Sequence, residues 1–114
     1  MELHYSELDN GISFVKLCGK LDIIGTGEIE TRFMGYCSGD NIRVVVDLVD
    51  VNFLASIGIR MLVTSAKSVA SRGGKMVLLN PTPEVLGVLE VTGIPAIIPV
   101  YSRLESAETV LMAA

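Results

Sequence analysis

The sequence predicts a single α/β domain built on a mixed, mostly parallel sheet. Its 114 residues suit one domain (1–114), and half of them are hydrophobic, which supplies a compact core. Strand-like and helix-like segments follow one another in the order ββαβαβαβα. After an opening hairpin, right-handed crossovers should make neighbouring strands parallel, in an α/β sandwich with about four helices.

The opening hairpin is predicted by two strand-like segments, 3–8 and 12–18, that flank Asp9-Asn10-Gly11. Asn-Gly tolerates the positive φ angles of a type I′ turn, which joins two antiparallel strands tightly. We therefore expect the first two strands to pair antiparallel.

The later elements follow from the spacing of apolar residues and from capping signals. Helical segments repeat apolar residues at intervals of three and four, whereas the strand-like segments are short β-branched runs. Thr82-Pro83 and the capping box Ser102-Arg103-Leu104-Glu105 indicate two helix starts. The expected elements are a helix at 26–37, a strand at 42–48, a helix at 56–71, a strand at 76–79, a helix from 83 to near 93, a strand at 97–100 and a terminal helix after Ser102. In the helix at 56–71, the residues expected to face the core are Ile59, Leu62, Val63, Ala66, Val69 and Ala70.

Composition and charge argue against several classes of function. The formal net charge is −4 and no basic stripe is visible, so we expect no direct nucleic-acid binding. No run approaches the ~18–20 apolar residues that span a bilayer, and the N-terminus lacks a leader pattern. We therefore expect no membrane insertion and a cytoplasmic location. Cys18 and Cys37 have no CxxC spacing and are expected to be buried, reduced thiols.

The sequence offers no set of residues for catalysis or for cofactor binding. The single histidine, His4, and two separated cysteines cannot make a standard zinc site. There is no GxxxxGK[ST] phosphate loop, and Gly25-Thr26-Gly27 is too short for a dinucleotide fingerprint. We therefore expect a protein that is not an enzyme and that needs no cofactor.

The most informative segment runs from Asp47 to Arg60, where an apolar strand turns into an amphipathic helix. Ser56 stands at that turn, where the first N–H groups of a helix lack helical partners and the helix dipole favours negative charge. A phosphate on Ser56 would be held there without a metal ion. The alternative interpretation is that Ser56 is only the N-cap of the helix, because serine is a leading N-cap residue. The residue pattern alone leaves both interpretations open.

Several segments resemble, in this order, motifs of the STAS domain family, and specifically of the free-standing anti-sigma factor antagonists. Gly19-Lys20-Leu21-Asp22 resembles the family's Gly-x-Leu-Asp segment, and the strand at 44–48 with the approach at 51–54 resembles the next motif. Ser56-Ile57-Gly58-Ile59 resembles the phosphoacceptor motif, Asp-Ser-x-Gly-hydrophobic, except that Ala55 replaces the usual Asp. Segments 73–78 and 91–94 also fit, so the resemblance covers essentially the whole chain.

This resemblance implies a phosphorylation switch at Ser56, with Asp22 as a partner-contact residue beside it. Asp22 is almost equally well explained as a cap of the following helix. The further residues that we expect at the partner surface are Asn52, Leu54, Ala55, Ile57, Gly58 and Arg60. The implied partners are an anti-sigma factor that is a serine kinase of the histidine-kinase-like ATPase fold, and a PP2C-type phosphatase. Binding of the unphosphorylated protein to this kinase would release a sigma factor, and phosphorylation would end the binding.

A second hypothesis belongs to a different class of function. Some STAS domains are cytoplasmic parts of membrane transport complexes, such as ABC-type lipid transporters or anion transporters, and need no phosphorylation. The absence of an acidic residue before Ser56 and the high apolar content keep this alternative open.

Overall fold

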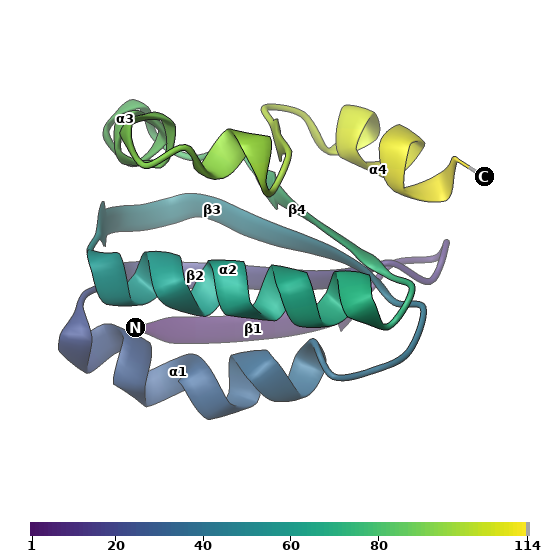
Figure 1. The fold of residues 1–114 in the computed structure, drawn as a ribbon, viewed down its shortest axis with the longest axis horizontal. Coiled ribbons are helices and arrows are strands. Elements are labelled where there is room, and N and C mark those ends of the chain that lie inside the picture. Colours follow the sequence, from purple (N-terminus) through teal and green to yellow (C-terminus); the bar gives the residue numbers. More distant parts are fainter. Residues whose placement is uncertain (114) are drawn as a thin grey trace.

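The alternating pattern of the sequence produces a five-stranded sheet with helices packed around it (Figure 1). The computed structural model describes residues 1–113. Its elements are β1 (Glu2–Glu7), β2 (Ser13–Leu21), α1 (Ile23–Tyr36), β3 (Arg43–Leu54), α2 (Ser56–Ser71), β4 (Lys75–Leu79), α3 (Pro83–Val91), a 3-10 turn η1 (Ile94–Ala96), β5 (Val100–Tyr101) and α4 (Leu104–Met112). This order of strands and α-helices confirms the predicted ββαβαβαβα.

The sheet has the strand order β1-β2-β3-β4-β5, in which β1 and β2 are antiparallel and every other pair is parallel. The long strand β3 runs beside β2 to its very end, where Leu21 is the pairing partner of Leu54. By contrast, β4 pairs only with the first part of β3, from Arg43 to Asp47. The carboxyl ends of β2 and β3 therefore meet at one end of the molecule, and α1 and α2 both begin there (Figure 1).

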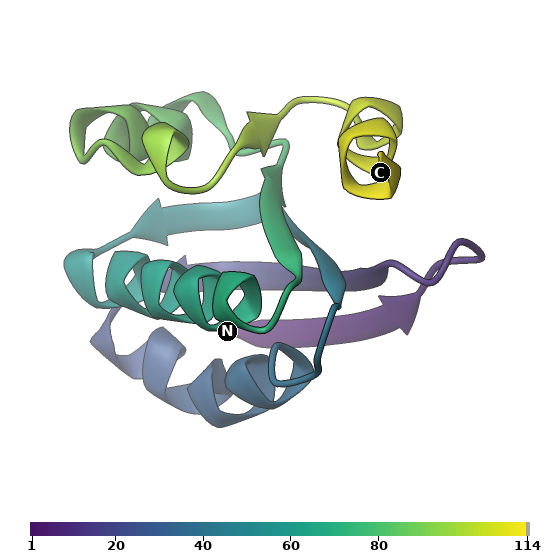
Figure 2. The ribbon, with the colours of Figure 1, turned by 45° about the vertical axis from the view of Figure 1, so that its right-hand side comes forward.

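Two apolar clusters hold the helices on the two faces of the sheet. The larger cluster joins Val46 of β3 to Phe33 of α1 and Leu62 of α2, and it also includes residues of α3. The smaller cluster joins Val45 to Ala107 of α4. Val45 is adjacent to Val46 in β3, and its side chain points to the opposite face of the sheet. Side chains of a strand alternate between faces, so α1 and α2 cover one face and α4 covers the other (Figure 2).

The hairpin confirms the predicted antiparallel pairing but not the predicted turn. The carbonyl of Leu8 accepts a hydrogen bond from the amide of Gly11, and Gly11 has a φ of 85°. Asn10 does not have the positive φ that a type I′ turn requires. The loop therefore spans three residues and ends in a left-handed glycine.

All four elements of the first half before α2 differ from the expected bounds. The first strand is shifted by one residue, and the second, expected at 12–18, continues to Leu21. The first helix begins at Ile23 and not at Thr26, because Asp22 caps it. The strand expected at 42–48 continues to Leu54, because β2 pairs with it along that whole extension.

Near the C-terminus the last strand is confirmed, but it lies at Val100–Tyr101 and not at 97–100. The amides of Ile97 and Ile98 bond to the carbonyl of Ile94 and extend the 3-10 turn, so that β5 begins only at Val100. The predicted capping box is also absent, because Arg103 occupies the N-cap position of α4 and no side chain caps it.

Within α2 the predicted core face is confirmed in part. Leu62, Ala66 and Val69 are buried, Ile59 and Val63 are half-buried, and Ala70 is exposed. Met61 and Ser65 are also buried, although the sequence did not predict it. Cys37 is buried as expected, but Cys18 is only half-buried. Within residues 1–113, no helix combines the length and the apolar character needed to cross a bilayer.

Candidate functional site

Ser56 is the first residue of α2, and its side chain is exposed. The N-cap position belongs to Ala55, whose methyl group cannot accept a hydrogen bond. The interpretation of Ser56 as only an N-cap is therefore wrong. Within residues 1–113, no hydrogen bond of the Ser56 hydroxyl is found, so this hydroxyl contributes no cap to the helix.

At the start of α2 some backbone groups are hydrogen-bonded and others are free. The amide of Ala55 donates to the carbonyl of Leu21 over 3.0 Å, and the carbonyl of Ala55 accepts from the amides of Gly58 and Ile59. The amides of Ser56 and Ile57 have no acceptor among the described residues. Two free N–H groups beside an exposed hydroxyl form the arrangement that a helix offers to a phosphate.

Gly58 fixes how closely this helix start approaches the sheet. A Cβ atom at this position would lie 2.9 Å from the Cβ of Leu21 and 3.0 Å from a methyl carbon of Leu54. Only glycine allows that approach without a shift of the neighbours. The glycine of the Ser-x-Gly motif therefore has a packing reason, which is independent of any reaction at Ser56.

Asp22 caps the neighbouring helix α1. Its Oδ1 atom accepts a hydrogen bond of 2.7 Å from the amide of Gly25, which confirms the expected cap. Asp22 also follows Leu21, whose carbonyl holds Ala55, so the two helix starts are adjacent. A contact between Asp22 and a partner stays a prediction.

Apolar side chains stand exposed around this pair of helix starts. Ile23 and Ile24, the first two residues of α1, are 74% and 75% exposed, and Phe53 at the end of β3 is 50% exposed. We call Ile23, Ile24 and Phe53 the apolar rim. Exposed apolar side chains are typical of a protein interaction surface where they form a patch. The sequence contained a signal for it, since two isoleucines directly follow a capping residue, but only the structure shows that they face outward.

The residues expected at the partner surface divide by exposure. Asn52 and Arg60 are exposed, and Ala55 and Ile57 are half-buried. Leu54 and Gly58 are buried beneath them, so they support the surface from below. The role of each in partner binding stays a prediction.

A small cavity of about 230 Å³ adjoins the site on its other side. It lies between the end of β3, with Phe53 and Leu54, and helix α3, with Val85 and Val88. This cavity exists because β4 does not pair with the second part of β3, which α3 approaches instead. It extends the apolar rim towards α3.

The ionisable groups of the described residues include one ion pair and two thiols with raised pKa values. No group of three or more His, Cys, Asp or Glu side chains that could hold a metal ion is found in residues 1–113. Lys16 pairs with Asp50 over 3.0 Å, and this hydrogen bond raises the pKa of the Lys16 ammonium. Burial raises the pKa of the Cys37 thiol to about 12, and burial followed by the charge of Asp50 raises the pKa of Cys18. Both thiols are therefore poor nucleophiles at neutral pH.

Comparison with known proteins places this geometry in context. The sequence model of the STAS domain family matches residues 6–107 of this chain. BtrV of Bordetella bronchiseptica, which is named as an anti-sigma factor antagonist, is 28% identical over 107 residues, which cover 94% of this chain and 91% of BtrV.

Solved structures share the fold. An anti-sigma-factor antagonist (STAS) domain protein from Planctomyces limnophilus has a TM-score of 0.86 at 21% identity and covers 97% of this chain and 98% of its own. SpoIIAA in its unphosphorylated form has a TM-score of 0.78 at 17% identity and covers 99% of both chains. The phosphorylated form of SpoIIAA from Bacillus has a TM-score of 0.66 at 18% identity, covering 96% of this chain and 99% of its own.

The same fold occurs in a transporter. The murine anion transporter Slc26a9 has a TM-score of 0.77 at 17% identity over 91% of this chain, which corresponds to 18% of the transporter. At these identities the solved structures show the fold alone. The family model, by contrast, matches most of the chain, and this match shows that the protein belongs to the STAS domain family.

Proposed function

We propose that this protein is an anti-sigma factor antagonist that is switched by phosphorylation of Ser56. Unphosphorylated, it binds an anti-sigma factor in the cytoplasm, and this partner is a serine kinase with the histidine-kinase-like ATPase fold. The binding frees a sigma factor. Phosphorylation of Ser56 ends the binding, and a PP2C-type phosphatase restores it. The protein itself carries out no catalysis.

The exposed hydroxyl of Ser56, at an uncapped helix start and beside the apolar rim, is the observation that carries this proposal. A kinase can reach such a hydroxyl, and Phe53 of the rim lies only three residues before it in the chain. Ser56 is the only Ser or Thr between Ser38 and Thr64. The name of BtrV and the two forms of SpoIIAA support the same assignment.

The physical basis of the switch is a difference between the free protein and the complex. Phosphate adds about −1.5 to −2 charges at neutral pH. In the free protein, water and the open amides of Ser56 and Ile57 stabilise that charge. In the complex, the same charge would be buried against apolar side chains, where an unpaired charge is costly. Phosphorylation therefore weakens binding without unfolding the protein.

The test uses purified full-length protein and candidate anti-sigma factors of the ATPase-fold type. We expect ATP-dependent transfer of one phosphate to Ser56, located by mass spectrometry. Ser56→Ala should bind the partner in the presence of ATP, whereas Ser56→Asp should bind at least about tenfold more weakly, or about 1.4 kcal/mol. Equal affinities of the two variants, or phosphate found only elsewhere, would contradict the switch.

A second candidate function is that of a STAS component of a membrane transporter. The similarity of the fold to the transporter Slc26a9 favours it. Co-purification of the protein with a transporter, together with failure of every candidate kinase to label Ser56, would support this second function and not the first.

A further inference from the structure

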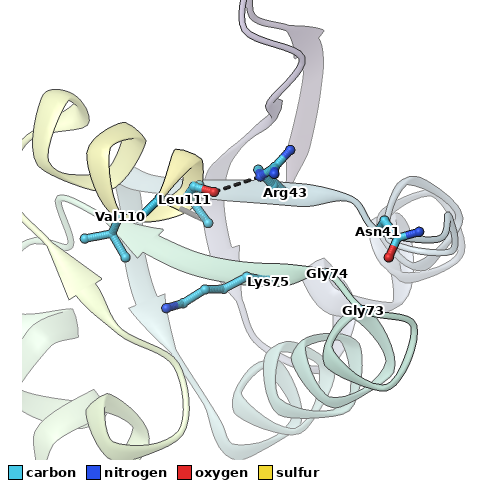
Figure 3. Close-up of a pocket in the computed structure, with 8 residues that line it drawn as sticks. Asn41, Arg43, Gly73, Gly74, Lys75, Val110 and Leu111 are labelled. Atoms are coloured by element: carbon cyan, nitrogen blue, oxygen red, sulfur yellow. Dashed lines mark hydrogen bonds between the residues drawn. The ribbon is translucent and has the colours of Figure 1, made fainter.

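A second cavity, of about 550 Å³, lies at the opposite end of β3 from Ser56. Figure 3 shows residues that line it. It is bounded by the first residues of β3 and β4, by Gly73 and Gly74, and by the C-terminal part of α4. The twelve residues of β3 separate it from the start of α2, a span on the order of 35 Å. A ligand in this cavity would not touch the apolar rim.

Two cationic residues on neighbouring strands border this cavity. Arg43 of β3 and Lys75 of β4 are direct pairing partners in the sheet, and both are exposed. Like charges on neighbouring positions of two strands repel each other. Within residues 1–113, neither side chain forms an ion pair. The nearest acidic residue in sequence, Asp40, is directed to Arg72 instead, at 4.0 Å. This pair of charges is thus left without an anion in a chain whose net charge is negative.

The guanidinium of Arg43 is held in a fixed orientation. Its Nε atom donates a hydrogen bond of 2.7 Å to the carbonyl of Leu111, near the end of α4. The two terminal nitrogens of the guanidinium keep their donors free, since no other bond of this side chain is found within residues 1–113. A planar fork that is already oriented loses little entropy when it binds an oxyanion.

The geometry also restricts the shape of the ligand. Figure 3 shows the Arg43 side chain on one side of the cavity, while the Lys75 side chain extends away from Arg43 and toward Val110. The two cationic groups therefore do not converge on one point. The backbone amides of Gly73, Gly74 and Lys75 are already bonded to carbonyls, so they cannot form an anion nest. An anion with two or more phosphate groups can therefore present a separate charge to each cation.

We propose that this cavity binds an extended phosphate anion of the pyrophosphate or tripolyphosphate type, with Arg43 and Lys75 as its two contacts. The anion neutralises two neighbouring cations of the sheet that have no ion-pair partner among residues 1–113. The same chemistry is presented by inorganic polyphosphate and by the phosphate chain of a nucleotide, and the experiment distinguishes these two sources.

The experiment titrates the full-length, isotope-labelled protein at low salt with orthophosphate, pyrophosphate, tripolyphosphate and ATP in separate series, followed by NMR. We expect saturable shifts of the amides of Arg43, Gly74 and Lys75, and none at Ser56. Pyrophosphate and tripolyphosphate should bind at least about fivefold more tightly than orthophosphate. ATP that binds no more tightly than tripolyphosphate identifies the phosphate chain as the recognised group, and tighter binding of ATP identifies a nucleotide.

Matched variants separate a site from general attraction to positive charge. Lys75→Gln should weaken pyrophosphate binding about tenfold, which is about 1.4 kcal/mol. Lys67→Gln removes the same charge from an exposed lysine of α2 outside the cavity and should change the affinity less than about twofold. Equal losses in both variants, orthophosphate as tight as pyrophosphate, or shifts that do not saturate would each overturn the proposal. None of these results depends on whether Ser56 is phosphorylated.

Discussion

The amide of Ala55 donates a hydrogen bond of 3.0 Å to the carbonyl of Leu21, and this contact joins the start of α2 to the end of β2. Leu21 is followed by Asp22, which caps α1. The first residues of α1 and α2, Ile23 and Ser56, are 33 positions apart in the sequence. This one bond brings the first turns of the two helices side by side. The candidate site is a consequence of that junction, because the rim comes from α1 and the end of β3 and the hydroxyl comes from α2.

Replacement of Ser56 should leave the stability of the protein nearly unchanged. Ser56→Ala removes a hydroxyl that caps nothing, so we expect a change in the free energy of unfolding within about 0.5 kcal/mol. Ser56→Asp places a negative charge at a helix N-terminus and should be neutral or stabilising by about 0.3–1 kcal/mol. Urea denaturation measures both. A loss above about 1 kcal/mol in Ser56→Ala would show that the hydroxyl does act as a cap.

Gly58 should tolerate no side chain. Gly58→Ala forces a methyl group against Leu21 and Leu54, and we expect a loss of about 1–3 kcal/mol in the free energy of unfolding. The control is Gly27→Ala, in the exposed part of α1, where nothing lies within 4 Å of the added methyl group. That variant should gain about 0.5–1 kcal/mol from helix propensity. Similar effects of the two substitutions would contradict the packing reason given for Gly58.

Two substitutions of Asp22 should separate its role as a helix cap from the role of its charge. Asp22→Ala loses the bond to the amide of Gly25 and should cost about 0.5–2 kcal/mol of stability. Asp22→Asn keeps an acceptor oxygen and should retain most of the stability. Chemical denaturation gives the first effect. If Asp22→Asn then binds the anti-sigma factor more weakly while it stays folded, the carboxylate has a role in partner binding beyond its cap.

The apolar rim should matter for binding and not for folding. Ile23→Ser and Phe53→Ser each remove an exposed apolar side chain, so stability should change by no more than about 0.5 kcal/mol. Each should weaken binding to the anti-sigma factor by about tenfold or more, as expected for residues central to an interface. Val91→Ser is the matched control, because Val91 is 88% exposed at the far end of α3. Titration calorimetry measures the affinity of each variant for the anti-sigma factor. Equal affinities of all three variants would exclude the rim as the interface.

Cys37 should make the protein less stable at alkaline pH. Its thiol has a pKa of about 12 in the folded protein and about 8.5 in an unfolded chain, so the folded state holds the proton to higher pH. Stability is therefore unaffected by this group below about pH 8.5, and falls by up to about 1.4 kcal/mol per pH unit as the pH rises from there towards 12. Denaturation at pH 7 and pH 10 measures the loss.

The control for this pH dependence is Cys37→Ala. It lowers stability at every pH, because it removes buried atoms, but it should abolish the part of the alkaline loss that the thiol causes. The same burial predicts that a neutral alkylating reagent modifies Cys18 before Cys37 in the folded protein. An alkaline loss that is identical in the Cys37→Ala variant would assign the effect to other groups.

The element types and their order could be predicted from the sequence, because apolar spacing reports which residues face a core. The motif around Ser56 was also visible, since a hydroxyl between an apolar strand and an amphipathic helix stands out. Bounds were less accurate. The strand that ends at Leu54 was predicted to end at residue 48, because its extension is stabilised by pairing with β2, which no local pattern reveals.

What the sequence determined by itself is the STAS-like succession of strands and helices and the placement of Ser56 at a helix start. Only the tertiary structure decided that Ala55 takes the cap position, that Ile23 and Phe53 face outward beside Ser56, and that Arg43 and Lys75 become neighbours. The physical reason is that caps, exposure and cross-strand pairs depend on contacts between residues that are far apart in the chain, whereas periodicity depends only on near neighbours.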